Sequence, residues 1–263
     1  MRLLMIGDIV GRPGRRAVRE NLKRLTQEWD IDFVIANGEN AAGGNGITQS
    51  VAEELFSIGI DVLTMGNHVW DKKEVFSFID TDYRIVRPAN YPPGTPGAGY
   101  GIFEVKSGAK VAVCNLSGRV FMPELDCPFR KADEMLAEIK EYTQVTLLDF
   151  HAEATSEKIA LGWYLAGRVS AVVGTHTHVQ TADERILPGG TAYITDVGMT
   201  GPRDSVIGVK KELVINKFIS MLPQRFAVAT GPYQFNAIVL DINDETGQAL
   251  AIERIHFMEN LAK

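Results

Sequence analysis

The sequence has few cysteines and no long apolar stretch, and each shortage narrows what the protein can be. Its 263 residues include two cysteines, Cys114 and Cys127, which do not form a Cys-x-x-Cys pair. This excludes a small disulfide-stapled domain and predicts reduced thiols in a cytoplasmic protein. The apolar start of the chain is too short for a signal peptide, and no later segment reaches the length of a membrane span, so we expect no membrane association.

Basic residues are also in the minority. The chain has 27 Lys and Arg against 33 Asp and Glu, a formal net charge of −6. Because binding along a nucleic-acid backbone needs a basic surface, we expect no stable complex with DNA. A small anionic substrate stays open if a local cationic group receives it. The hydrophobic fraction of 45% is ordinary for a globular protein, and the absence of repeats or linkers predicts a single domain over residues 1–263.

Short apolar runs alternate with helical patterns over the first two-thirds of the chain. This alternation predicts an α/β layered fold. The predicted strands are Leu3–Ile6, Phe33–Ala36, Val62–Met65, Val111–Leu116, Val145–Phe150 and Ala171–Gly174. The predicted helices run from Val18 to Trp29, from a cap near Ser50, from Asp71, over Leu136–Tyr142 and over Ile159–Ala166.

The last third of the chain looks mostly β. Strands are predicted over Thr191–Thr195, Arg225–Thr230, Phe235–Leu240 and Ala249–His256, with a helix near Lys210–Met221. These strands complete a second sheet or extend the first, and the sequence leaves both open. Exposed apolar side chains on this part leave a homo-oligomer open as well.

Polar side chains follow five of the predicted strands, at the point where each strand ends. Two of the five histidines, His176 and His178, come directly after one apolar run, and in an extended backbone they would point to the same side. In open α/β sheets, ligand sites form at this edge. The candidate residues are Asp8, Glu39, Asn40, Asn67, His68, His151, His176 and His178.

This set of residues favours a transition-metal site. Carboxylates, carboxamides and imidazoles together suit Mn, Fe or Zn. Without His68, the candidate ligands are still more than one ion needs. We therefore expect two ions that share a carboxylate. Such a pair lies about 3.5–4 Å apart and generates a bridging hydroxide at neutral pH. Taken singly, each residue has a plainer explanation as a turn former, a cap or a structural hydrogen-bonding group.

Together the motifs resemble the calcineurin-like metallophosphoesterase superfamily. The matching pieces are Gly7-Asp8, Gly66-Asn67-His68, His151 and Gly174-Thr175-His176-Thr177-His178. Asn37-Gly38-Glu39-Asn40 and Thr200-Gly201-Pro202 are similar to the bacterial YmdB-type branch, as is the start of the chain. The resemblance implies a four-layer αββα sandwich of two mixed β-sheets flanked by helices.

The chain departs from the wider superfamily at two positions. Val10 stands where the first motif, Asp-x-His, has its histidine, and Glu39 replaces a bridging aspartate. Asn40 can fill the place left by Val10. The resemblance implies two divalent or trivalent transition-metal ions, with Fe favoured over Mn and Zn. One ion would be bound by Asp8, Glu39, Asn40 and His178, and the other by Glu39, Asn67, His151 and His176.

The resemblance also implies hydrolysis of a small phosphodiester, in particular a 2′,3′-cyclic nucleotide, by attack of the bridging hydroxide. His68 directly follows a ligand candidate, so it can protonate the leaving oxygen, or it merely bonds a neighbour such as Asp71. Arg203 is a candidate for substrate contact, although a solvated loop arginine is the favoured explanation. The alternatives are a phosphomonoesterase or nuclease on the same core, and a regulatory metal-binding protein with slow chemistry.

Overall fold

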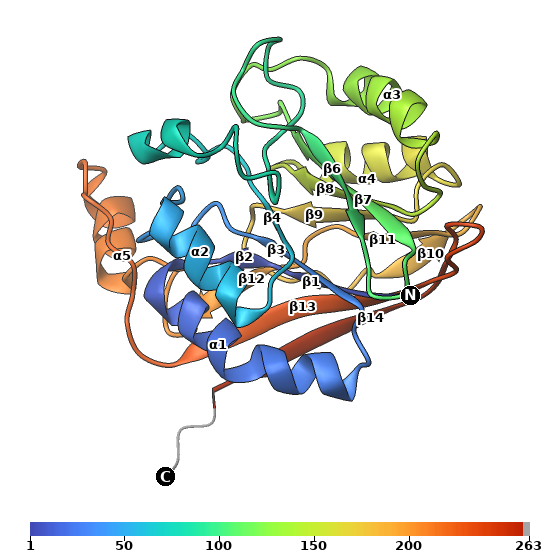
Figure 1. Ribbon diagram of the computed structural model, residues 1–263. Helices are drawn as coiled ribbons and strands as arrows, with labels where there is room; N and C mark the ends of the chain where they lie inside the picture. Colours follow the sequence, from blue (N-terminus) through green and yellow to red (C-terminus); the bar gives the residue numbers. More distant parts are fainter. Residues whose placement is uncertain (260–263) are drawn as a thin grey trace.

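Two mixed β-sheets lie face to face at the centre of the molecule, as the ribbon in Figure 1 shows. The computed structural model describes residues 1–259. The strands of the first sheet are β1 (Arg2–Ile6), β2 (Asp8–Ile9), β3 (Phe33–Asn37), β4 (Val62–Thr64), β5 (Ile85–Val86), β12 (Met199–Pro202), β13 (Tyr233–Ile242) and β14 (Ala249–Met258). Their order is β2-β12-β13-β1-β3-β4-β5, with β14 beside β13. β1, β3, β4 and β5 run parallel, whereas β13 is antiparallel to β1.

The second sheet has the same mixed character. Its strands are β6 (Tyr100–Glu104), β7 (Lys110–Ser117), β8 (Thr146–His151), β9 (Ala171–Thr175), β10 (Arg185–Leu187) and β11 (Thr191–Ile194), in the order β10-β11-β9-β8-β7-β6. The four central strands are parallel, and the two edge strands β10 and β6 are antiparallel to their neighbours.

Helices cover the outer faces of both sheets. α1 (Gly11–Glu28) and α2 (Gln49–Ile58) pack on the first sheet, and α3 (Pro128–Ile139) and α4 (Thr155–Leu165) pack on the second. α5 (Lys211–Ser220) lies to one side of the two sheets, at the left in Figure 1. The predicted four-layer αββα sandwich is therefore confirmed.

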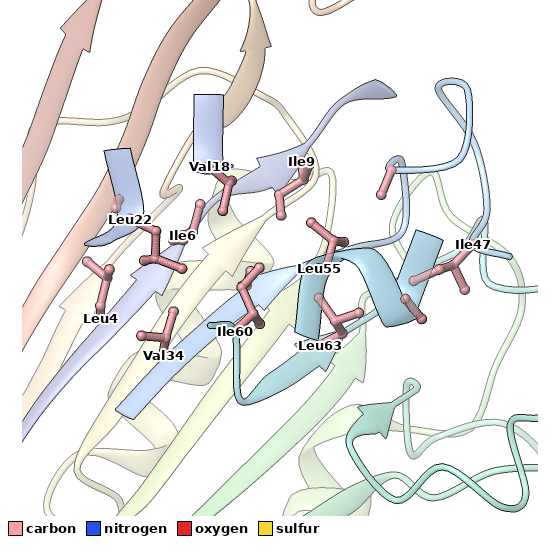
Figure 2. Packing of buried hydrophobic residues seen from close by; sticks show 14 of the residues in the cluster. Leu4, Ile6, Ile9, Val18, Leu22, Val34, Ile47, Leu55, Ile60 and Leu63 are labelled. Atoms are coloured by element: carbon pink, nitrogen blue, oxygen red, sulfur yellow. The ribbon is translucent and has the colours of Figure 1, made fainter. Parts of the chain in front are cut away.

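Alternating side chains explain why the layers stack. Leu4 and Ile6 of β1 are buried under α1 and α2 in the cluster that Figure 2 shows. Leu3 and Met5 of the same strand point the other way and pack against the second sheet, where they join Val113 of β7. Because side chains alternate along a strand, one apolar strand can bury both of its faces, and this is what a middle layer requires.

The predicted C-terminal strands are divided between the two sheets: Thr191–Thr195 joins the second sheet as β11, whereas β13 and β14 extend the first. All five residues of β1 pair with residues 237–241 of β13. The predicted strand Arg225–Thr230 is wrong: this segment is irregular, and Val228 makes only an isolated bridge with Val209. The segment packs against the loop around Val209 rather than along a sheet edge, so it has no neighbour with which to form a ladder.

Two predicted helix starts also differ from the structure. Thr48, not Ser50, caps α2, since its hydroxyl oxygen accepts the hydrogen bond from the Val51 N–H. Asp71 caps no helix, and only a short 3₁₀ helix over Lys73–Ser77 follows it. Its carboxylate is instead bonded to Nδ1 of His68, the contact that the sequence suggested, and to Nδ2 of Asn45, which local spacing does not reveal.

The helix predicted over Leu136–Tyr142 begins well before that range, at Pro128, and ends at Ile139. Proline is favoured at the first helical position because its missing N–H is not needed there. Both cysteines, Cys114 and Cys127, are free thiols. Over residues 1–259, none of the helices combines the length and the apolar character needed to cross a membrane.

Candidate metal centre and adjoining cavity

Strand ends from both sheets meet at one point in the molecule. The loops after β1, β3 and β4 come from the first sheet, and the ends of β8 and β9 come from the second. Hydrogen bonds and close contacts link all eight residues that the sequence nominated here: Asp8, Glu39, Asn40, Asn67, His68, His151, His176 and His178. The structure therefore brings the predicted set together.

His151 lies at the centre of this group and is fully buried. Its Nε2 is 3.0 Å from Oε1 of Glu39, 3.1 Å from Oδ1 of Asn67 and 3.0 Å from Nδ1 of His176. One ligand atom from each of Glu39, His151 and His176 lies within 4.8 Å of the other two. Electron-pair donors thus converge from three separate strand ends.

A chain of hydrogen bonds fixes the orientation of the His151 ring. The Thr175 hydroxyl donates to Oδ1 of Asp149 at 2.7 Å, so its oxygen accepts from Nδ1 of His151 at 2.9 Å. Thr64 and Asn37 donate to the other oxygen of Asp149. Because Nδ1 carries the proton of this bond, Nε2 is the nitrogen that faces the centre of the group, as is usual for metal-binding histidines.

Asp8, Asn40 and His178 form the other half of the group. Nε2 of His178 is 3.2 Å from Nδ2 of Asn40 and 3.8 Å from Oδ1 of Asp8. Asp8 is fully buried, and among the residues that the structure describes its Oδ1 has no hydrogen-bond partner. Nδ1 of His178 donates to the Ile207 carbonyl at 2.9 Å, so Nε2 carries the free lone pair here as well.

The backbone at His176 and His178 is not extended. The sequence-based expectation that both side chains point to the same side assumed an extended backbone, so that assumption is wrong. β9 ends at Thr175, and the two histidines have φ angles of 100° and 67°. Such left-handed conformations are rare outside glycine and persist where surrounding contacts hold them. Here Asp196 accepts from the N–H and the hydroxyl of Thr177, the residue between them.

Asp196 is itself part of a buried ion pair. Its Oδ2 is 2.6 Å from Nζ of Lys158 in α4, and both side chains are almost completely excluded from solvent. Lys158 thus neutralises the carboxylate that holds the segment between the two histidines. The pair connects an outer helix to the centre of the site.

Gly66 shows how closely the strand ends approach. A Cβ atom at this position would lie 2.3 Å from Oε2 of Glu39 and 2.4 Å from Nε2 of His151. Any other residue would push these two side chains apart. The glycine of the Gly-Asn-His motif is therefore a requirement of space.

The charges of the group favour a bound cation. Burial raises the pKa of Asp8 to about 6, against the opposing effect of His178 and His151. Burial would likewise raise the pKa of Glu39, but the charge on His151 outweighs it and leaves a pKa of about 2. Burial would lower the pKa of His151, but Glu39 and Asp8 raise it to about 9. Two buried carboxylates therefore attract positive charge to their centre.

His176 behaves in the opposite way. Burial and the charge of His151 lower its pKa to about 3, so its ring stays neutral. Its Nε2 is 3.2 Å from Oε2 of Glu153, which leaves Nδ1 as the nitrogen that faces the group. An unpaired buried carboxylate oxygen, imidazole nitrogens that face inward and a central Glu39 fit the ligand chemistry of transition-metal ions.

His68 lies at the edge of the group. Its N–H donates to Oε2 of Glu39 at 3.0 Å, and its Nδ1 is 2.8 Å from Oδ2 of Asp71. The contact between His68 and Asp71 that the sequence suggested is thus present.

Arg203, the candidate for substrate contact, bonds its guanidinium to Asp204 and is not among the residues that line the cavity described next.

A cavity of about 490 Å³ adjoins the group and has two unlike sides. The polar side consists of Glu39, Asn40, Asn45, His68, Glu153, His176, Thr177 and His178. The apolar side consists of Val10, Ile207, Val209, Phe226 and Val228. The volume lies within the range of small-molecule sites, which is about 300–1,000 Å³.

Sequence reasoning missed several residues that position this site. Asp149 stands two residues before His151 in an otherwise apolar strand, and a buried acid in such a strand is a signal that could have been used. Glu153, Lys158 and Asp196 carry no comparable signal, because their partners come from distant parts of the chain. Phe226 was assigned to a strand that does not exist.

Comparison with solved structures gives the class of the protein. The fold matches a phosphatase from Mycoplasma pneumoniae with a TM-score of 0.93 and 35% identity, over 99% of this chain and 94% of that one. It also matches a protein from Thermus thermophilus with a TM-score of 0.93 and 46% identity, over 99% and 100% of the two chains. The protein is therefore a phosphoric ester hydrolase of the metallophosphoesterase class, which implies bound divalent metal ions.

Sequence comparison then gives the family. Residues 4–255 match the model of the YmdB-like proteins, and the chain belongs to that family. A relative from Bacillus subtilis (strain 168), named 2′,3′-cyclic-nucleotide 2′-phosphodiesterase, is 57% identical over 256 residues. That alignment covers 97% of this chain and 96% of the relative.

Proposed function

We propose that this protein is a two-metal phosphodiesterase that hydrolyses 2′,3′-cyclic nucleotides. The observation that carries the proposal is the convergence of Glu39, Asn67 and His176 on Nε2 of His151 at 3.0–3.1 Å, beside a cavity large enough for a nucleotide. The name of the B. subtilis relative supports this substrate class and points to the bond between phosphorus and the 2′ oxygen as the one that breaks.

The proposed ligands divide into two sets that share Glu39. One set is Asp8, Glu39, Asn40 and His178, and the other is Glu39, Asn67, His151 and His176. Glu39 is suited to both because its Oε1 contacts Nδ2 of Asn40 and Nε2 of His151, one from each set. Mixed imidazole and carboxylate ligands suit iron, manganese or zinc. The resemblance to the metallophosphoesterases favours iron among the three. When bound, such ions polarise a phosphoryl oxygen and activate water.

His68 is the proposed proton donor. When the phosphorus–oxygen bond of the cyclic diester breaks, the departing 2′ oxygen needs a proton, and His68 is the lining imidazole outside the two ligand sets. Its bond to Asp71 orients the ring with Nδ1 turned away, which leaves Nε2 for the substrate. The main-chain bond to Glu39 keeps the residue next to the metal ligands.

Two measurements test the proposal. Protein purified without chelator is analysed for metal content and then assayed at fixed metal concentration. We expect kcat/KM for 2′,3′-cyclic AMP to exceed that for p-nitrophenyl phosphate by more than about tenfold. A preference for the monoester, or protein that takes up no metal, contradicts the proposal.

The role of His68 has its own test. His68→Asn should lower kcat for 2′,3′-cyclic AMP by about 10²–10³-fold and leave the metal content unchanged. With bis(p-nitrophenyl) phosphate the loss should be much smaller, because p-nitrophenolate leaves without a proton. Equal losses on both substrates would show that His68 does not act as the acid.

A further inference from the structure

The apolar side of the cavity is exposed to solvent although it faces a strongly polar site. Ile207 is 51% exposed and Phe226 is 43% exposed, and both line the cavity. Val228, on the same side, is half-buried. Large apolar side chains that are left in water at the mouth of a polar site indicate a ligand with an apolar face of its own.

Backbone hydrogen bonds hold this side in place. The Lys210 N–H donates to the Ala227 carbonyl at 3.0 Å, and the Ala229 N–H donates to the Gly208 carbonyl at 2.9 Å. These bonds join the loop that carries Ile207 to the loop that carries Phe226 and Val228. The apolar side is thus organised before any ligand arrives, which lowers the entropic cost of binding.

Ile207 connects the apolar side to the metal centre. Its φ angle is 45°, a conformation that a β-branched residue rarely adopts and that is retained where the fold enforces it. Its carbonyl accepts the hydrogen bond from Nδ1 of His178 at 2.9 Å. The distance between the apolar side and a proposed metal ligand is therefore set by a direct contact.

The Phe226 ring is also anchored. Nζ of Lys217 lies 4.9 Å from the centroid of the ring, a cation–π contact. Lys217 is not among the residues that line the cavity, so it contacts the ring from outside the lining. The contact restricts the movement of a ring that lines the cavity.

Few polar groups are available to bind the edge of a base. The side-chain amide of Asn45, which lines the cavity, is already bonded to Asp71 and Lys72. The Thr177 hydroxyl donates to Asp196. The side chains of the apolar side carry no donor or acceptor, so through them this side recognises the face of a flat ring and not its pattern of donors and acceptors.

We propose that Phe226, together with Ile207 and Val228, binds the nucleobase of the substrate by stacking, an assignment that rests on the proposed function. Every base has a π-face, so this subsite accepts all four bases and binds purines more tightly than pyrimidines. Phe226 is then a binding residue with no part in the chemical step.

The test compares substrates with and without a base. Metal-loaded wild type, Phe226→Ala, Phe226→Leu and Phe226→Trp are assayed with 2′,3′-cyclic AMP and with glycerol 1,2-cyclic phosphate. Phe218→Ala is the matched control, because Phe218 is an exposed aromatic residue of α5 outside the cavity lining. Binding of adenosine 3′-monophosphate and of inorganic phosphate is measured in parallel by calorimetry.

We expect Phe226→Ala to raise KM for 2′,3′-cyclic AMP about tenfold, with kcat little changed and with no effect on glycerol 1,2-cyclic phosphate. Phe226→Leu should show part of this loss and Phe226→Trp almost none. An equal change on both substrates, no change on either, or the same change in Phe218→Ala overturns the assignment. Phe226→Leu decides in the same way if the alanine variant does not fold.

The calorimetry separates this assignment from the proposed function. If the wild type hydrolyses neither cyclic ester, the proposed function is wrong, and the binding data still decide the subsite. Weaker binding of adenosine 3′-monophosphate by Phe226→Ala, with unchanged binding of phosphate, supports the stacking subsite. Equal affinities of wild type and variant overturn it.

Discussion

The two sides of the cavity are built in opposite ways. The polar side comes mainly from the ends of strands in both sheets. It adjoins the buried ring of His151, which the His151–Thr175–Asp149 chain of hydrogen bonds holds in place. The apolar side comes mainly from two irregular loops, and its largest side chains, Phe226 and Ile207, are about half exposed. In the two proposals above, the polar side binds the metal ions and carries out the chemistry, and the apolar side supplies substrate affinity.

The largest expected effect is on the polar side. Glu39→Gln removes the carboxylate that both proposed ligand sets share, so metal content should fall and kcat/KM should drop by about 10³–10⁴-fold. Elemental analysis and steady-state assays measure both. Glu141→Gln, which changes an exposed carboxylate, is the control. If the Glu39→Gln protein keeps its metal and its activity, Glu39 is not the shared metal ligand.

The buried ion pair behind the polar side should show the next largest effect. Lys158→Met leaves Asp196 charged, buried and without its cation, which should lower the free energy of unfolding by about 3–5 kcal/mol. Urea denaturation measures this loss. In the exposed pair Lys131–Glu134, the matched variant Lys131→Met should cost less than about 1 kcal/mol. Equal stabilities of the two variants would mean that the buried pair contributes no more than the exposed one.

A smaller effect is expected at Glu153, which contacts Nε2 of His176 at 3.2 Å. The Glu153 carboxylate orients the ring and strengthens Nδ1 as a ligand, so Glu153→Gln should weaken metal affinity about tenfold. Loss of a residue that hydrogen-bonds to a metal ligand typically weakens metal affinity about 10–100-fold, and because Glu153 is half exposed the effect should lie at the lower end of this range. Competition with a chromogenic chelator measures the metal affinity. An unchanged affinity would show that Glu153 does not contribute to metal binding.

The smallest effect should come from moving the apolar side. Gly44 has a φ angle of 103°, and a Cβ atom there would lie 2.5 Å from Cγ2 of Val228. Gly44→Ala should therefore displace Val228 and raise KM about threefold while the metal content stays constant. Gly43→Ala is the matched control, since Gly43 also has a positive φ angle but no atom within 4 Å of its added Cβ. A loss of metal in Gly44→Ala would contradict the division between the two sides.

Much of the candidate metal centre could be predicted from the sequence because its residues follow apolar runs directly. Parallel strands of a sheet end at a common edge, so Asp8, Glu39 and Asn67 had to come close once their strands were assigned. The pairing of Glu153 with His176, or of Lys158 with Asp196, could not be predicted. Both depend on contacts between elements far apart in the chain.

The apolar side could not be predicted for a different reason. The pattern of Arg225–Thr230 is typical of a strand, but a strand forms only where a neighbour supplies hydrogen bonds. Here the neighbour is the short loop at Val209, which allows one bridge. The same segment thus became one side of a cavity.

The sequence by itself determined the layers and the residue types at the strand ends, because side-chain alternation and apolar runs are local properties. Only the tertiary structure decided which nitrogen of each histidine faces inward, which carboxylate is left without a partner and where the exposed aromatic ring lies. These depend on hydrogen bonds and packing between segments that approach each other only after the chain has folded.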